Sequence, residues 1–213
     1  MKTRLWLLLI ALGGAVLPGC ELAIIGAGSA MGVAAIEDRR AGTVQIEDEG
    51  IELRVGNRIS DRFRDKVHVS VTSFNRAVLL SGEVPDEQAR GEAEKIAAGV
   101  PGVRGVTNDL QVAKISSDQS RINDSFITGK VKARFVDAGR FNALHVKVVT
   151  EAAVVYLLGI VTEKEANDAV GIARTTGGVR KVVKVFEYCK STDNICRPGG
   201  RPAARDPKPK PAG

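Results

Sequence analysis

The sequence has few of the residues from which metal centres and aromatic binding surfaces are built. Among its 213 residues there are two His and three Cys, and aromatic residues make up 4%. So few nitrogen and sulfur ligands argue against a metal enzyme, and three Cys cannot staple a miniprotein. The 44% hydrophobic and 26% charged residues are typical of a globular protein. They exclude a multi-pass membrane protein and a mainly disordered chain.

The N-terminus has the pattern of an export signal that ends at a cysteine. Two basic residues precede an apolar run over 5–17, which is shorter than a typical transmembrane helix. The ending Leu17-Pro18-Gly19-Cys20 is similar to the lipobox of bacterial lipoproteins, although Pro18 departs from the usual small residue. This similarity implies that 1–19 is a lipoprotein signal peptide and that Cys20 becomes the acylated N-terminus. An ordinary signal peptide with a chance cysteine is the alternative.

The residue after the cysteine bears on the location of the protein. It is Glu21 and not Asp, which by resemblance to lipoprotein sorting in Gram-negative bacteria favours the outer membrane. We therefore expect a lipid-anchored protein of the outer membrane that faces the periplasm. Several acyl chains, at about 0.8 kcal/mol per buried methylene, hold a domain stably on a bilayer. Residues 20–45, rich in small side chains, are expected to form the tether.

Most of the remaining chain is a tandem repeat, because four segments recur in the same order further along. The matched segments are 59–63 with 131–135, 67–71 with 144–148, 76–84 with 153–161, and 102–106 with 178–182. The offset is 72 for the first pair and 76 or 77 for the others. This difference predicts five extra residues in the second copy, between its first helix and its first strand.

We call residues 46–114 the first repeat and residues 124–190 the second repeat, with 115–123 as the expected linker. In the first repeat, an apolar residue at every fourth position from Ile51 to Phe63 predicts a helix. Alternation over 67–71 predicts a strand, which a turn at Asn75 and Arg76 and a returning strand should follow. A second helix and a third strand complete the order α-β-β-α-β. The predicted fold class is α+β, each repeat being a three-stranded mixed sheet with two helices on one face.

This pattern resembles the BON domain family of bacterial envelope proteins. Its most specific elements are Gly82 and Gly159 near the ends of the second strands, and the Gly-Val turns before the last strands. The resemblance covers nearly all of the expected globular part. It implies a non-enzymatic protein that supports outer-membrane integrity, near the outer-membrane protein assembly machinery and the division site. A scaffold that binds an envelope protein, with incidental lipid contact, is the alternative function.

The two repeats carry opposite net charge. Residues 46–114 hold 10 basic and 12 acidic side chains, whereas residues 121–190 hold 12 basic and 7 acidic ones. In the first helix of the second repeat, basic residues alternate with more apolar residues than a buried stripe needs, as in a membrane-surface helix. The family resemblance implies that this helix binds anionic phospholipid of the phosphatidylglycerol type. The predicted phospholipid-binding residues are Phe126, Ile127, Lys130, Val131, Lys132, Arg134 and Val136. A solvated basic face is the alternative.

The two histidines, His68 and His145, fall at equivalent positions of the two repeats. One metal site built from both is conceivable, but two strand residues inherited by duplication are the simpler interpretation. No catalytic constellation is visible, and we expect no enzyme activity, cofactor or metal. Nucleic acid is not expected as a partner, since the export signal removes the chain from it and no aromatic stacking platform is present.

The remaining two cysteines, Cys189 and Cys196, lie close together after the last predicted strand. A disulfide between them is the simplest expectation in an oxidising periplasm, and free thiols are the alternative. Residues 191–213 are basic and rich in proline, which predicts a disordered tail.

Overall fold

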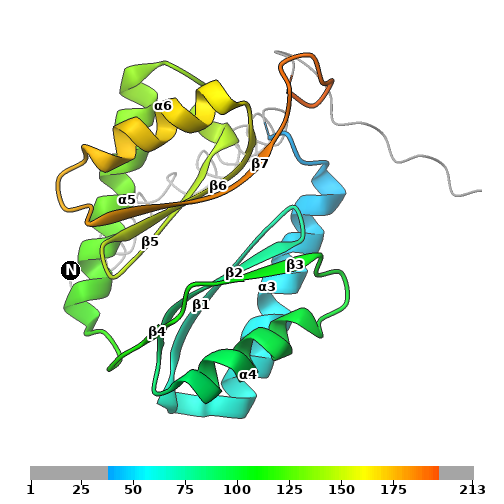
Figure 1. Cartoon of the computed structure of the whole chain (residues 1–213), viewed down its shortest axis with the longest axis vertical. Coiled ribbons are helices and arrows are strands. Elements are labelled where there is room, and N and C mark those ends of the chain that lie inside the picture. The colour runs from blue at the N-terminus through cyan, green and yellow to red at the C-terminus, as the bar shows by residue number, and fades with distance from the viewer. Residues whose placement is uncertain (1–37, 197–213) are drawn as a thin grey trace, which may run out of the picture. The chain divides into compact units, whose positions relative to one another are not determined.

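In the computed structural model, which describes residues 38–196, each repeat is a three-stranded sheet with two helices on one face (Figure 1). The expected signal peptide, Cys20, most of the expected tether and most of the expected tail lie outside the described residues. The elements of the first repeat are α3 (Gly42–Phe63), a 3-10 turn (Arg64–Lys66), β1 (His68–Phe74), β2 (Ala77–Val84), α4 (Glu87–Ala98), β3 (Gly105–Asn108) and β4 (Gln111–Val112). Those of the second are α5 (Asp118–Ala138), a 3-10 turn (Ala143–His145), β5 (Lys147–Glu151), β6 (Val154–Val161), α6 (Glu163–Arg174) and β7 (Lys181–Tyr188).

The sheets have the predicted mixed topology. The central strand, β2 or β6, pairs antiparallel with the strand before it and parallel with the last strand of the repeat. In the first repeat the last strand is split into β3 and β4, which both pair with β2. The split lets Leu110 turn into the core, where it is buried. The α+β prediction is confirmed.

Each repeat has its own apolar core between its helices and its sheet. In the first repeat, Ile51, Val55 and Ile59 of α3 pack against Val78 and Leu80 of β2. The second repeat builds the same core from the buried side of α5 and from β6. The four-residue spacing seen in the sequence is thus the spacing of the buried stripe on the first helix of each repeat.

The first helices of the two repeats align one turn differently from the sequence prediction. Asp48 of α3 accepts hydrogen bonds from the backbone N–H groups of Asn75 and Arg76, at 2.8 and 2.7 Å. Asp124 of α5 accepts from the equivalent N–H groups of the turn Ala152-Ala153, at 2.9 and 2.8 Å. The helices therefore correspond at an offset of 76, and the prediction of five extra residues before β5 is wrong. Because apolar residues recur at every fourth position of these helices, the sequence pattern also matches when it is shifted by one helical turn. The sequence comparison therefore chose the wrong alignment.

The segment 115–123, which we expect to link the repeats, is partly helical, because α5 begins at Asp118. The side chain of Ser117 caps this helix by accepting a hydrogen bond from the N–H of Ser120. Likewise α3 begins at Gly42, inside the expected tether. The start of α5 is thus marked by a side-chain cap, which the apolar periodicity does not report, whereas Ala41 before α3 provides no such cap.

A third apolar cluster lies on the sheet faces that the helices leave uncovered. It joins Phe74 and Leu79 of the first repeat to Tyr156, Leu158 and Ile160 of the second. The Tyr156 hydroxyl donates to Asp109 Oδ2 at 2.8 Å, and Lys147 pairs with Glu52 at 2.8 Å, so polar contacts also connect the repeats. Cys196 belongs to the same cluster, and the structure joins it to Cys189 by the disulfide expected from the sequence.

Arg39, just before α3, is held by Glu165 at the start of α6. Both guanidinium Nη atoms reach the carboxylate, at 2.8 and 2.9 Å, and Nη1 also donates to the Ile160 carbonyl. Glu165 also accepts from the N–H of Thr162 and completes a capping box with it. Burial alone would raise the pKa of Glu165, but Arg39 and Thr162 bind its ionised form and lower the pKa from 4.5 to about 2.

This carboxylate predicts an acid-dependent loss of stability. A lowered folded-state pKa stabilises the fold above the unfolded pKa near 4.5, and this contribution disappears as the pH falls toward 2. In circular-dichroism melts, the Glu165→Gln variant should have a clearly lower Tm than wild type at pH 7. The difference should shrink steadily between pH 4.5 and pH 2. A difference that stayed constant over this range would contradict the assignment.

Candidate functional site

The exposed side of α5 carries an apolar stripe opposite the side that faces the core. Ile122, Phe126 and Val136 are 50, 66 and 68% exposed, and the exposed Gly129 and Ala133 lie between them. Alternating spacings of four and three residues place all five on one narrow strip of the helix. We call these five residues the α5 stripe. Packing in the protein core does not explain the α5 stripe, since the large side chains of this stripe are exposed to solvent.

The buried side of the same helix corrects part of the predicted lipid site. Ile127 and Val131 are 0% exposed and pack in the core of the second repeat with Phe135. They cannot touch a lipid surface while the repeat is folded. Of the apolar residues predicted, Phe126 and Val136 remain accessible, and Ile122 was missed. Its four-residue spacing from Phe126 was visible in the sequence, but Ile122 lay in the expected linker.

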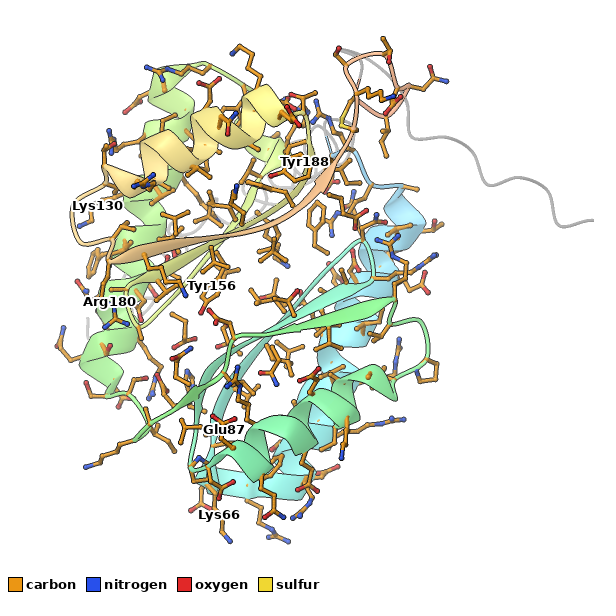
Figure 2. All side chains as sticks on the ribbon, viewed as in Figure 1. Lys66, Glu87, Lys130, Tyr156, Arg180 and Tyr188 are labelled. Atoms are coloured by element: carbon orange, nitrogen blue, oxygen red, sulfur yellow. A yellow bond between two sulfur atoms is a disulfide. The ribbon has the colours of Figure 1, made fainter. Side chains whose placement is uncertain are left out.

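The basic residues of α5 differ in their surroundings. Lys130 and Lys132 fall on opposite flanks of the α5 stripe, and both are exposed. Lys130 Nζ donates to the Gly177 carbonyl at 2.9 Å, in the loop between α6 and β7 (Figure 2). Arg134 is half-buried, and its Nη1 donates to the Ile172 carbonyl and the Thr176 hydroxyl at 3.0 and 2.8 Å. Arg134 therefore closes the C-terminal end of α6 and holds the two helices together.

A second basic feature of this repeat was not predicted. A groove of about 570 Å³ runs between α6 and β7 and is lined by cationic and apolar side chains. The lining residues are Val170, Arg174, Val179, Arg180, Lys181, Val182 and Lys184. None of the lining residues from the described part of the chain is acidic. These cations all fall within residues 174–184, but they belong to a helix end, a loop and a strand, so only the packing of α6 beside β7 shows that they share one surface.

The two histidines lie in separate surroundings. His68 Nε2 is 3.3 Å from Glu151 Oε1, whereas His145 Nδ1 is 3.3 Å from Glu165 Oε1. Each histidine also supplies the carbonyl oxygen that a Cβ at the facing glycine would strike, at 2.1 Å for Gly82 and 2.3 Å for Gly159. This close approach explains why both repeats have glycine there.

Comparison with known proteins identifies the repeats. The model of the BON domain matches residues 47–114 and 123–190. The chain belongs to the BON domain family. The family membership predicted from the repeat pattern is thereby confirmed, and each match begins within the first helix of a repeat and ends at or just after its last strand.

Several known proteins are similar to this chain over most of its length. It is 40% identical to the outer membrane lipoprotein DolP of Haemophilus influenzae, over 85% of this chain and 95% of the relative. It is 35% identical to the 21 kDa hemolysin of Actinobacillus pleuropneumoniae, over 72% of this chain and 79% of the relative. The osmotically-inducible protein Y of Escherichia coli is 33% identical, over 64% and 70%. None of these three names denotes an enzyme.

The outer-membrane location predicted from the lipobox agrees with the lipoprotein of Haemophilus influenzae. Along residues 38–196, no helix combines the length and the apolar character that crossing a bilayer requires.

Proposed function

We propose that this chain is a lipid-anchored outer-membrane protein, facing the periplasm, whose second repeat binds anionic phospholipid through α5. The observation that carries the proposal is the α5 stripe, an exposed apolar strip with Lys130 and Lys132 on its two flanks. This arrangement suits a helix that lies in a membrane interface, with apolar side chains among the acyl chains and cations at the phosphates. The cationic groove beside α6 adds positive charge to the same repeat.

The expected affinity is modest, which suits a protein that is already tethered. Burying a large apolar side chain contributes about 1.5–3 kcal/mol, and each Lys near an anionic surface about 1 kcal/mol. Part of this gain is offset by the cost of orienting the domain on the membrane. An acyl chain on Cys20 would keep the domain close to the bilayer, so that a weak contact is occupied most of the time.

In this proposal the protein supports outer-membrane integrity by holding its second repeat on anionic lipid. The first repeat is net acidic and its first helix lacks a comparable stripe. In α3, Ile46 and Leu53 are exposed on one side, but the next residue on that strip is the polar Asn57. The first repeat is thus the part available to a protein partner, for which the outer-membrane protein assembly machinery is the candidate.

Binding to vesicles tests the lipid contact. Residues 38–196 contain all three apolar clusters, so a chain beginning at residue 38 carries the contact without the acyl chains. The double change Phe126→Ser and Val136→Ser should weaken binding to phosphatidylglycerol-containing vesicles at least tenfold, since two large side chains no longer enter the interface. Lys132→Gln should weaken it about fivefold at low salt. Co-sedimentation measures both effects.

The matched control is Leu53→Ser in the first repeat, because Leu53 is as exposed as Phe126, at 65 against 66%. It should change vesicle binding less than twofold. Equal binding to neutral and anionic vesicles, or an undiminished affinity of the double variant, would refute the lipid contact. Capture of one defined envelope protein through the first repeat, without any lipid binding, would favour the scaffold function instead.

A further inference from the structure

The buried side-chain polar atoms of residues 38–196 that lack a hydrogen-bond partner gather at one place. Within residues 38–196 three buried side-chain atoms accept or donate no hydrogen bond, namely His68 Nε2, Ser81 Oγ and Ser116 Oγ. All three residues adjoin Glu83. His68 is the residue paired with it across β1 and β2, Ser81 lies two positions before it on the same sheet face, and the N–H of Ser116 donates to its Oε2 at 3.2 Å. Buried polar groups are normally satisfied, so this concentration points to a polar ligand.

A third ligand group reaches the same place from the other repeat. Glu151, the last residue of β5, brings its Oε1 to 3.3 Å from His68 Nε2. A ligand atom of His68, one of Glu83 and one of Glu151 all lie within 4.8 Å of one another. The two carboxylates are nearly inaccessible, at 4 and 7% exposure. The cluster therefore joins a nitrogen and two carboxylate groups at the junction of the repeats.

Within residues 38–196, no Lys or Arg side chain is recorded in an ion pair with Glu83 or Glu151. Glu83 receives one backbone N–H bond, and Glu151 Oε2 receives the Ser70 hydroxyl at 2.8 Å. Arg121 lines the adjoining cavity, but its guanidinium donates to the Ser116 carbonyl and to Asp118. Two buried carboxylates with neutral donors are costly unless a cation lies between them.

We propose that His68, Glu83 and Glu151 bind a first-row divalent transition-metal ion that bridges the two repeats. One imidazole and two carboxylates suit Zn²⁺ or Mn²⁺ better than Mg²⁺ or Ca²⁺, which prefer all-oxygen sites. A point equidistant from atoms 4.8 Å apart lies about 2.8 Å from each. Bonds of about 2.0–2.2 Å therefore need side-chain shifts of less than about 1 Å.

The surroundings allow an ion to enter and to complete its coordination. A cavity of about 340 Å³ opens beside the cluster, and His68, Ser70 and Glu151 are among its lining residues. Water in this cavity can supply the remaining ligands. Because the ligands come from β1, β2 and β5, an ion bound here adds a link between the sheets besides their apolar contact.

Calorimetric titration of the full chain in detergent with Zn²⁺ tests the site, and Mg²⁺ serves as the comparison ion. Wild type should bind one equivalent of Zn²⁺, with Mg²⁺ at least a hundredfold weaker. His68→Ala and Glu83→Gln should each weaken Zn²⁺ binding at least tenfold. His145→Ala is the matched control, since it removes the equivalent histidine of the second repeat, and it should leave the affinity unchanged.

A spectroscopic readout keeps the test independent of how well a variant folds. The chain has two histidines, so nitrogen NMR of the imidazoles should show Zn²⁺ shifting the ring signals of His68 and leaving those of His145 in place. A second variant, His68→Gln, replaces His68→Ala if the latter does not fold. Absence of Zn²⁺ binding, equal binding by wild type and His68→Ala, or a shift at His145 instead would overturn the proposal. If no Zn²⁺ binds, His68 would be an ion-pair partner of the two glutamates.

Discussion

Replacing Asp48 with Ala should lower the free energy of unfolding by about 3–4 kcal/mol, which is a large effect for one small side chain. Asp48 is buried in α3, and its two oxygens accept four hydrogen bonds. Two come from the backbone of the β1–β2 turn, one from the Ser73 hydroxyl and one from Arg40. Each donor would lose its partner in a site from which water is excluded.

The turn itself adds to the expected cost. Asn75 and Arg76 both have positive φ, at 51 and 66°, which non-glycine residues adopt unfavourably. Asp48 holds both N–H groups of this turn and thereby offsets the unfavourable conformation. It also anchors Arg40, whose guanidinium lies 4.1 Å above the ring of Phe74. Loss of one carboxylate thus releases the hairpin and the segment that precedes α3.

Thermal melts measure the effect. At about 2–4 °C per kcal/mol, the Tm of Asp48→Ala should fall by roughly 10 °C. The control is Glu49→Ala, the adjacent exposed carboxylate, which should shift the Tm by less than about 2 °C. If both variants melted alike, the four hydrogen bonds would not be what stabilises the hairpin.

Tyr156→Ala should cost about 3–5 kcal/mol and should also separate the unfolding of the two repeats. Tyr156 is almost fully buried between the sheets, and its hydroxyl donates to Asp109 of the first repeat. Burial and this hydrogen bond both raise the pKa of the tyrosine, so the ring stays neutral. Truncation leaves a cavity in the apolar cluster that joins the repeats and removes a polar contact between them.

Tyr188 provides the matched control, because it is the other tyrosine of the chain, lies at the end of β7 and is 55% exposed (Figure 2). Tyr188→Ala should change stability by less than about 1 kcal/mol. Calorimetry should show one transition for wild type and for Tyr188→Ala, and two partly resolved transitions for Tyr156→Ala. A single transition with an unchanged Tm for Tyr156→Ala would show that the repeats are coupled elsewhere.

The candidate lipid site shows how much of a binding site residue patterns can predict. Basic and apolar residues in one segment identified the helix, and two of the predicted apolar residues, Phe126 and Val136, are exposed on it. Ile127 and Val131 were assigned to lipid as well, although they occupy the buried stripe. Arg134 was predicted to bind phospholipid as well, but its guanidinium donates to the Ile172 carbonyl at the end of α6. Burial and hydrogen-bond partners depend on neighbours that are distant in sequence.

The sequence by itself determined the two repeats, their α-β-β-α-β order and their α+β class, because alternation and four-residue periodicity are local consequences of burying one face. It also separated an acidic repeat from a basic one, since charge is a property of composition. Only the tertiary structure decided the register of the first helices, which a periodic pattern leaves open to a slip of one turn. It alone brought His68, Glu83 and Glu151 together, because that cluster arises from strand pairing within one repeat and sheet packing between two.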